Sequence, residues 1–232
     1  MVYNLKSKLG LIDKTKLTEE ATKFYFVAPF FIHLEYDMFN PLEVIPEYSP
    51  RYYKTNEKVD FAFLFDETPR VFVEVKRISE GLTEKNINWL AKYFNAEPSV
   101  DLTILTNGEK YWFFSDLVHE NIMDKEPFYV FDLNYFTDVD LYLLGYFKRG
   151  NYTHFSIDSH LKTKGYINSL KKAFQNTYKN TEKIKHTLSK NNDYFFTCLY
   201  YIGGIDEDYL PKDVANMIIP VEKVREIFGG GC

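Results

Sequence analysis

The stretch VDFAFLFDETPRVFVEVK, residues 59–76, decides the fold of this chain. Residues 59–65 and 71–76 are rich in β-branched and aromatic side chains, which favour strands. The residues between them, Asp66 to Arg70, are turn formers and include a proline. Two strand-forming runs around a short turn predict a β-hairpin.

Two charged residues of the second run share one face of the predicted strand. Because side chains alternate along a strand, Glu74 and Lys76 point to the same side as Phe72. Charges on such an apolar strand are costly unless they pair or bind something. If the hairpin pairs about residues 66–70, Asp60 is expected near the level of Glu74 or Lys76.

Two converging carboxylates and a lysine suit a metal-dependent hydrolytic site. Mg²⁺ prefers oxygen ligands and is usually held by one or two carboxylates. The lysine would orient a metal-bound water and lower its pKa. The structural alternative is that Asp60 and Glu74 form salt bridges with Lys76 and Arg77 at a sheet edge.

The segments around the hairpin indicate an α/β (α+β) fold. Residues 17–34 are expected to form a helix with Glu19 in its first turn, followed by a short extended piece at 42–48. Residues 84–94 have helical spacing, and residues 101–116 are typical of two strands joined by an Asn-Gly turn. The predicted order is αβββαββ.

The pattern changes after this sheet-forming part. Helical segments are predicted at residues 138–147, 166–189 and 193–201, with two short helices around 211–228. We therefore expect a domain over residues 1–147 and a helical, partly basic extension over residues 148–232. The predicted joint is Lys148 to Tyr152, which contains a glycine.

The net charge of −5 conceals an uneven distribution. Residues 148–192 hold ten Lys and Arg against Asp158 and Glu182, whereas residues 1–147 hold 15 against 24 acidic residues. Such a basic block could follow a phosphate backbone, with contacts from Lys171, Lys172, Lys183 and Lys185. The alternative is a solvated, lysine-rich helical face.

Several functional classes find no support in the sequence. The longest apolar run, residues 24–34, is too short to span a bilayer, so no membrane partner is expected. The first residues lack a secretory signal pattern, which makes the cytoplasm the expected compartment. The two cysteines have no zinc-site spacing, and no GxxxxGK[ST] loop indicates an ATP site.

An ordered set of segments carries a family resemblance. It comprises TEEATKFYFVAPFF, EYDMFNPLEVIPEY, EKVDFAFLF, VFVEVKR, Tyr93-Phe94, ILTNGEKYWFFSD and KEPFYVFDL. Together, from Thr18 to about Asp132, these resemble the N-terminal nuclease domain of type I restriction enzyme R subunits and its stand-alone relatives. That family belongs to the PD-(D/E)XK superfamily.

The resemblance implies a restriction-endonuclease-like αβββαβ core with a central mixed sheet. It also implies that Asp60 and Glu74 are ligands of Mg²⁺, for which Mn²⁺ would substitute, and that Lys76 is the catalytic lysine. Glu19 matches a first-helix glutamate beside the metal site, although it would equally suit a helix-dipole partner. Tyr93 and Arg77 are expected to contact nucleic acid. Glu47 is expected to be structural.

Two functions remain open at this point. The first is a Mg²⁺-dependent DNA endonuclease in restriction or defence, mobile-element biology or DNA processing. The second is a catalytically weak or inactive module of the same fold that binds nucleic acid or a partner protein. Either function is compatible with a homo-oligomer. The second reading is favoured by Trp89, which stands where the family commonly has a glutamine.

Overall fold

The structure is a computed structural model that describes residues 2–50, 58–153, 156–178, 192–201, 203–205, 210, 212–220 and 222–223. The chain forms two compact units, Met1–Ser156 and Ile157–Cys232. The first unit carries the sheet and the predicted site. Helices make up most of what is described in the second unit.

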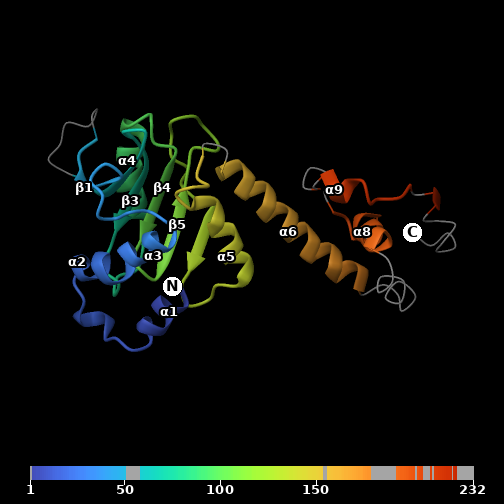
Figure 1. The fold of residues 1–232 in the computed structure, drawn as a ribbon, viewed down its shortest axis with the longest axis horizontal. Helices are drawn as coiled ribbons and strands as arrows, with labels where there is room; N and C mark the ends of the chain where they lie inside the picture. The colour runs from blue at the N-terminus through green and yellow to red at the C-terminus, as the bar shows by residue number, and fades with distance from the viewer. Residues whose placement is uncertain are drawn as a thin grey trace. The chain divides into compact units, whose positions relative to one another are not determined.

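A six-stranded mixed sheet forms the centre of the first unit (Figure 1). The strands lie side by side in chain order: β1 (Val44–Tyr48), β2 (Val59–Phe65), β3 (Thr68–Val75), β4 (Leu102–Thr106), β5 (Lys110–Phe114) and β6 (Tyr129–Asp132). Neighbouring strands are antiparallel except β3 and β4, which are parallel. A parallel pair needs a crossover, which α4 (Glu84–Ala96) supplies. The predicted α+β class is therefore confirmed.

Helices cover both faces of this sheet. On one face α4 buries Leu90 and Tyr93 in a core cluster that includes Phe72 of β3. On the other face Phe30 of α3 (Ala28–His33) stacks on Tyr111 of β5, with ring centroids 3.8 Å apart. Because successive strand residues alternate between these layers, both faces of the sheet are apolar.

The predicted helix over residues 17–34 is present and contains a π-helical turn. It consists of α2 (Glu19–Thr22), the π turn η2 (Lys23–Val27) and α3. The Thr18 hydroxyl caps its start by accepting a hydrogen bond from the Ala21 N–H at 3.1 Å. Single π turns are rare and are frequent at functional sites.

Three elements of the first unit were not predicted: a helix at the start of the chain, the 3₁₀ turn η1 (Lys14–Lys16) and the last strand of the sheet. Helix α1 (Val2–Leu9) buries Val2, Leu5 and Leu9, and it packs against α3. Strand β6 is only four residues long, so its alternation is too brief to identify. The predicted helix over residues 138–147 is present as α5 (Asp138–Leu144) and η3 (Gly145–Phe147).

The segment that follows η3 belongs to the first unit. The Arg149 N–H donates to the Leu34 carbonyl at 2.8 Å, and its guanidinium lies 3.9 Å from the centre of the Phe65 ring. The Tyr152 hydroxyl donates to Asp101. These contacts hold the predicted joint against the sheet domain, and the first compact unit runs to Ser156.

In the second unit the described helices are α6 (Ser156–Tyr178), α8 (Asn192–Tyr201) and α9 (Lys212–Ala215). Helix α6 begins earlier than the predicted residue 166, because Thr153 and Ser156 form a start signal in which the Thr153 N–H donates to Ser156 Oγ at 2.8 Å. A small cluster of Ala173, Leu199 and Ile205 is buried there. No helix among the described residues is long and apolar enough to cross a membrane.

Gly108 in the β4–β5 turn is expected to be essential for the packing of this turn on η2. Its φ is +78°, and a Cβ there would lie 2.9 Å from Phe26 Cβ and 3.0 Å from Thr22 Cγ2. Gly108→Ala should therefore lower the free energy of unfolding by at least about 1–2 kcal/mol, which thermal unfolding can measure. Gly81→Ala is the control, because a Cβ at Gly81 meets no atom within 4 Å. Equal melting temperatures for the two variants would contradict this expectation.

Candidate active site

The strand register aligns three carboxylate-bearing residues across neighbouring strands. Phe61 pairs with Val73, so the same register carried one residue further sets Asp60 opposite Glu74. On the other side of Asp60, Glu47 lies between the pairs Pro46–Phe61 and Tyr48–Val59. The row from β1 to β3 is therefore Glu47, Asp60 and Glu74. The predicted level of Asp60 is confirmed, whereas the position of Glu47 in this row was not foreseen.

Glu74 and Lys76 form a largely buried ion pair. Lys76 Nζ lies 2.5 Å from Glu74 Oε1, and the Glu74 side chain is only 3% exposed. The second carboxylate oxygen, Glu74 Oε2, is buried and has no hydrogen-bond partner among the described residues. An unpaired oxygen of this kind is costly unless a ligand or ion satisfies it.

Burial and neighbouring charge change the protonation of this pair. Burial, together with the negative charge of Asp60, raises the pKa of Glu74 to about 8. Burial alone would lower the pKa of Lys76, but the adjacent Glu74 carboxylate raises it above the ordinary value. Each of the two groups therefore holds its proton more tightly than an isolated carboxyl or ammonium group does.

Lys23 is the residue at this site that was not identified from the sequence. Its ammonium lies 2.5 Å from Asp60 Oδ1 and 2.6 Å from Glu20 Oε1, with Glu47 at 3.9 Å and Glu19 at 4.0 Å. Burial would lower the pKa of Lys23, but the hydrogen bonds to Asp60 and Glu20 raise it well above its usual value. A signal did exist, because Lys23 is the only charged residue between Glu20 and His33.

Hydrogen bonds between side chains and the backbone fix the helix that carries Lys23 to the end of β3. The Ile78 N–H donates to the Thr22 hydroxyl at 3.1 Å. Arg77 donates from Nε to the Leu17 carbonyl at 2.5 Å and from its terminal nitrogen to the Thr15 carbonyl at 2.9 Å. Arg77, which was expected to contact nucleic acid, therefore anchors the loop in front of α2.

Trp89 lies over the catalytic-lysine candidate. Lys76 Nζ is 5.4 Å from the centre of the Trp89 ring, a cation–π distance, and Trp89 packs edge-on against Tyr93 at 4.4 Å. Tyr93 is fully buried, so its ring contributes to the core and its expected contact with nucleic acid gains no support. Trp89, which stands where the family commonly has a glutamine, thus covers the Lys76 ammonium with an aromatic face.

Among the remaining predicted residues, Glu19 lies at the edge of this site, 4.0 Å from the Lys23 ammonium. Glu19 is partly exposed at the start of α2, and partial burial raises its pKa despite the nearby Lys76. Lys171 and Lys172 are exposed on α6 of the second unit. Lys183 and Lys185 lie outside the described residues, so their predicted role stays a prediction.

The carboxylate oxygens of Asp60 and Glu74 suit a hard divalent cation chemically. Each carboxylate is, however, also paired with an ammonium group, that of Lys23 or Lys76. Over the part of the chain that the structure describes, no three His, Cys, Asp or Glu side chains are grouped to hold a metal ion. Asp60 Oδ1 is paired with Lys23, and Asp60 Oδ2 accepts a hydrogen bond from the Val75 N–H at 2.6 Å. A cation bound here would coordinate Glu74 Oε2, the buried oxygen that has no hydrogen-bond partner among the described residues.

Known proteins give no further guidance on this arrangement. Comparisons of the chain with protein-family models, with curated proteins and with solved structures find no match.

The raised pKa of Glu74 predicts a specific pH dependence of stability. The folded state keeps a proton on Glu74 between the unfolded pKa of 4.5 and the folded pKa of about 8, whereas the unfolded state does not. The contribution of Glu74 to the free energy of unfolding is therefore fully present below about pH 4.5 and is lost as the pH rises towards 8. The slope is up to about 1.4 kcal/mol per pH unit.

Glu74→Gln should remove this slope, because glutamine cannot titrate. Urea unfolding of both proteins across this pH range is the measurement, and the difference between their free energies should grow with pH in favour of the variant. Parallel curves would show that Glu74 titrates normally.

Proposed function

We propose that the first unit is a Mg²⁺-dependent nuclease domain of the PD-(D/E)XK type that hydrolyses phosphodiester bonds in DNA. The observation that carries the proposal is the buried row of Asp60 and Glu74 on adjacent strands, with Lys76 beside Glu74 and one Glu74 oxygen unsatisfied. The αβββαβ order of the first unit supports it as well, because this order is the one that the family resemblance implies.

Each residue of the site has a role in this proposal. Asp60 and Glu74 would hold the cation, with Glu19 and Glu47 close enough to Lys23 to share the local charge balance. Bound Mg²⁺ would neutralise charge on the phosphate and lower the pKa of a coordinated water. Lys76 would place a positive charge beside the attacking water and the phosphate oxygens. Trp89 would hold that ammonium in place.

A second function is favoured by the two internal ion pairs. Lys23 neutralises Asp60, and Lys76 neutralises Glu74, so the carboxylates are partly compensated by the protein itself. In this alternative the domain retains the fold without turnover and binds nucleic acid or a protein. The exposed Lys171 and Lys172 of α6 would then contribute to nucleic-acid binding that weakens with salt.

Plasmid cleavage tests the first function. With Mg²⁺ the protein should nick or linearise DNA, and EDTA should abolish this. Asp60→Asn and Lys76→Ala should each lower the rate by at least about a hundredfold, because each removes charge from the reacting centre. Lys110→Ala is the control, since Lys110 forms a half-exposed pair with Asp132 away from the site. Cleavage that survives both substitutions would remove the assigned site from consideration.

The role of Lys23 gives a test that does not depend on turnover. Lys23→Met removes the ammonium that competes for Asp60, so the affinity for Mn²⁺ should rise by roughly tenfold or more. The variant should lose stability without metal, by about 3–5 kcal/mol, because Asp60 stays buried without its partner. Electron paramagnetic resonance of Mn²⁺ and thermal unfolding with and without Mn²⁺ measure the two effects. Lys14→Met, which breaks a pair with Glu109, is the control. Unchanged Mn²⁺ affinity would show that the cation does not use Asp60.

A further inference from the structure

A largely apolar groove adjoins the proposed active site. Its volume is about 780 Å³, within the range of small-molecule sites. Apolar side chains from the π turn, α3, the following loop and β1 line it, among them Phe24, Tyr25, Ile32, Met38, Phe39 and Pro46. We call this feature the Phe24 groove.

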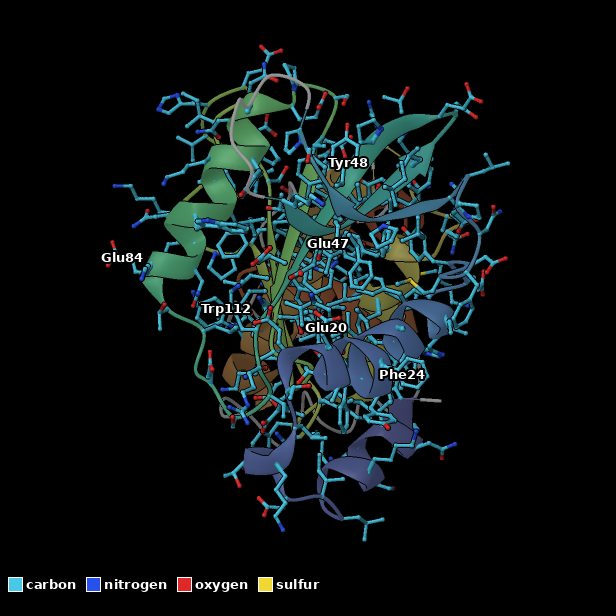
Figure 2. The ribbon with its side chains drawn as sticks, turned by 90° about the vertical axis from the view of Figure 1, so that its left-hand side faces the viewer. Glu20, Phe24, Glu47, Tyr48, Glu84 and Trp112 are labelled. Carbon is cyan, nitrogen blue, oxygen red and sulfur yellow. The ribbon has the colours of Figure 1, made fainter. Side chains whose placement is uncertain are left out.

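Exposed aromatic rings mark the groove. The Phe24 side chain is 64% exposed and the Phe39 side chain 77% exposed, and Phe24 packs edge-on against the half-exposed Tyr25. These rings contribute little burial to the fold, so packing does not explain them. The π turn that directs Lys23 inwards directs Phe24 and Tyr25 outwards. Figure 2 shows Phe24 on this helix and Glu20 near the strand that carries Glu47.

The charges of the groove select against phosphate groups. Glu20 and Glu47 lie along it, and Lys23 is already engaged by carboxylates. Lys8 is the other basic residue among those that line the groove. A DNA backbone entering here would meet acidic and apolar surfaces, which is unfavourable. A nucleobase is planar and uncharged, and its amino groups can donate to carboxylate oxygens.

The groove is continuous with the proposed catalytic residues. Asp60 and Lys23 form part of its lining, so an occupant of the groove would lie beside the carboxylate that holds the cation. Any base can stack on an aromatic side chain, whatever its identity. Stacking on the walls of the groove needs a free face of the base, and donation from its amino group to Glu20 or Glu47 uses the Watson–Crick edge, so the base that fits this groove is an unpaired one.

We propose that the Phe24 groove binds an unpaired nucleobase next to the scissile phosphate, so that the substrate is DNA with a single-stranded segment. The proposal rests on the proposed nuclease function and adds its substrate class. Phe24 and Phe39 provide the stacking surfaces, while Glu20 and Glu47 accept hydrogen bonds from base amino groups.

Fluorescence anisotropy with two labelled DNAs tests this assignment. One is a blunt duplex, and the other is the same duplex with a short unpaired flap, both in Ca²⁺ to limit cleavage. The flap DNA should bind more tightly. Phe24→Ala and Phe39→Ala should each weaken binding of flap DNA by at least about tenfold and leave the blunt duplex unaffected. Tyr135→Ala is the matched control, because Tyr135 is 83% exposed and does not line the groove.

The outcomes separate the groove from the nuclease proposal. Wild-type affinity for flap DNA in both phenylalanine variants would overturn the groove assignment, even if Asp60→Asn abolishes cleavage. If binding of flap DNA depends on Phe24 but the wild-type protein cleaves no DNA, the assignment of the groove would be supported and the nuclease proposal overturned. A change of oligomeric state in Phe24→Ala, seen by sedimentation, would instead make the groove an interface between copies of the chain and overturn the proposal.

Discussion

The carboxylate of Asp60 is the interaction on which the rest of the site depends. One oxygen accepts a hydrogen bond from the Val75 N–H of β3, and the other pairs with the Lys23 ammonium of η2. A single side chain on β2 thus links the central hairpin to the helix that covers it. A buried carboxylate is expensive unless it is paired and hydrogen-bonded, so the three elements must form together. The position of Lys23, and through it that of the Phe24 groove, follows from this requirement.

The charge balance around Asp60 leaves this cluster of side chains negative. Five carboxylates, those of Glu19, Glu20, Glu47, Asp60 and Glu74, converge on two ammonium groups, those of Lys23 and Lys76. The excess negative charge and the burial of Glu74 together raise its pKa to about 8. In the proposed nuclease, a divalent cation would supply the positive charge that this cluster lacks, and a proton held by Glu74 would leave as the cation bound.

Strand patterns predicted more of this site than helix patterns did. Alternation along residues 71–76 was sufficient to place Glu74 and Lys76 together, and the predicted hairpin set Asp60 near their level. The register that brings Asp60 opposite Glu74 depends on a shift between Phe63 and Leu64, which the sequence does not reveal. Lys23 was missed because its partners Asp60 and Glu47 come from other segments of the chain, and helical periodicity does not reveal which buried lysine meets which carboxylate. Glu47 was treated as structural, since its place in the row depends on the pairing of β1, and its positive φ of 53° cannot be read from sequence. Conformations of this kind are often retained at functional sites.

Trp89 bears on the proposed functions through Lys76. Among the described residues the ion-pair partner of Lys76 is Glu74, so a cation bound to Glu74 would leave the ammonium with weaker compensation. The Trp89 ring then matters, because its cation–π contact does not depend on the state of Glu74. A glutamine at that position would offer hydrogen bonds but no such surface. The aromatic ring therefore holds Lys76 by a cation–π contact in place of hydrogen bonds, and in the proposed nuclease it would keep the lysine in position once the carboxylates bound a metal ion.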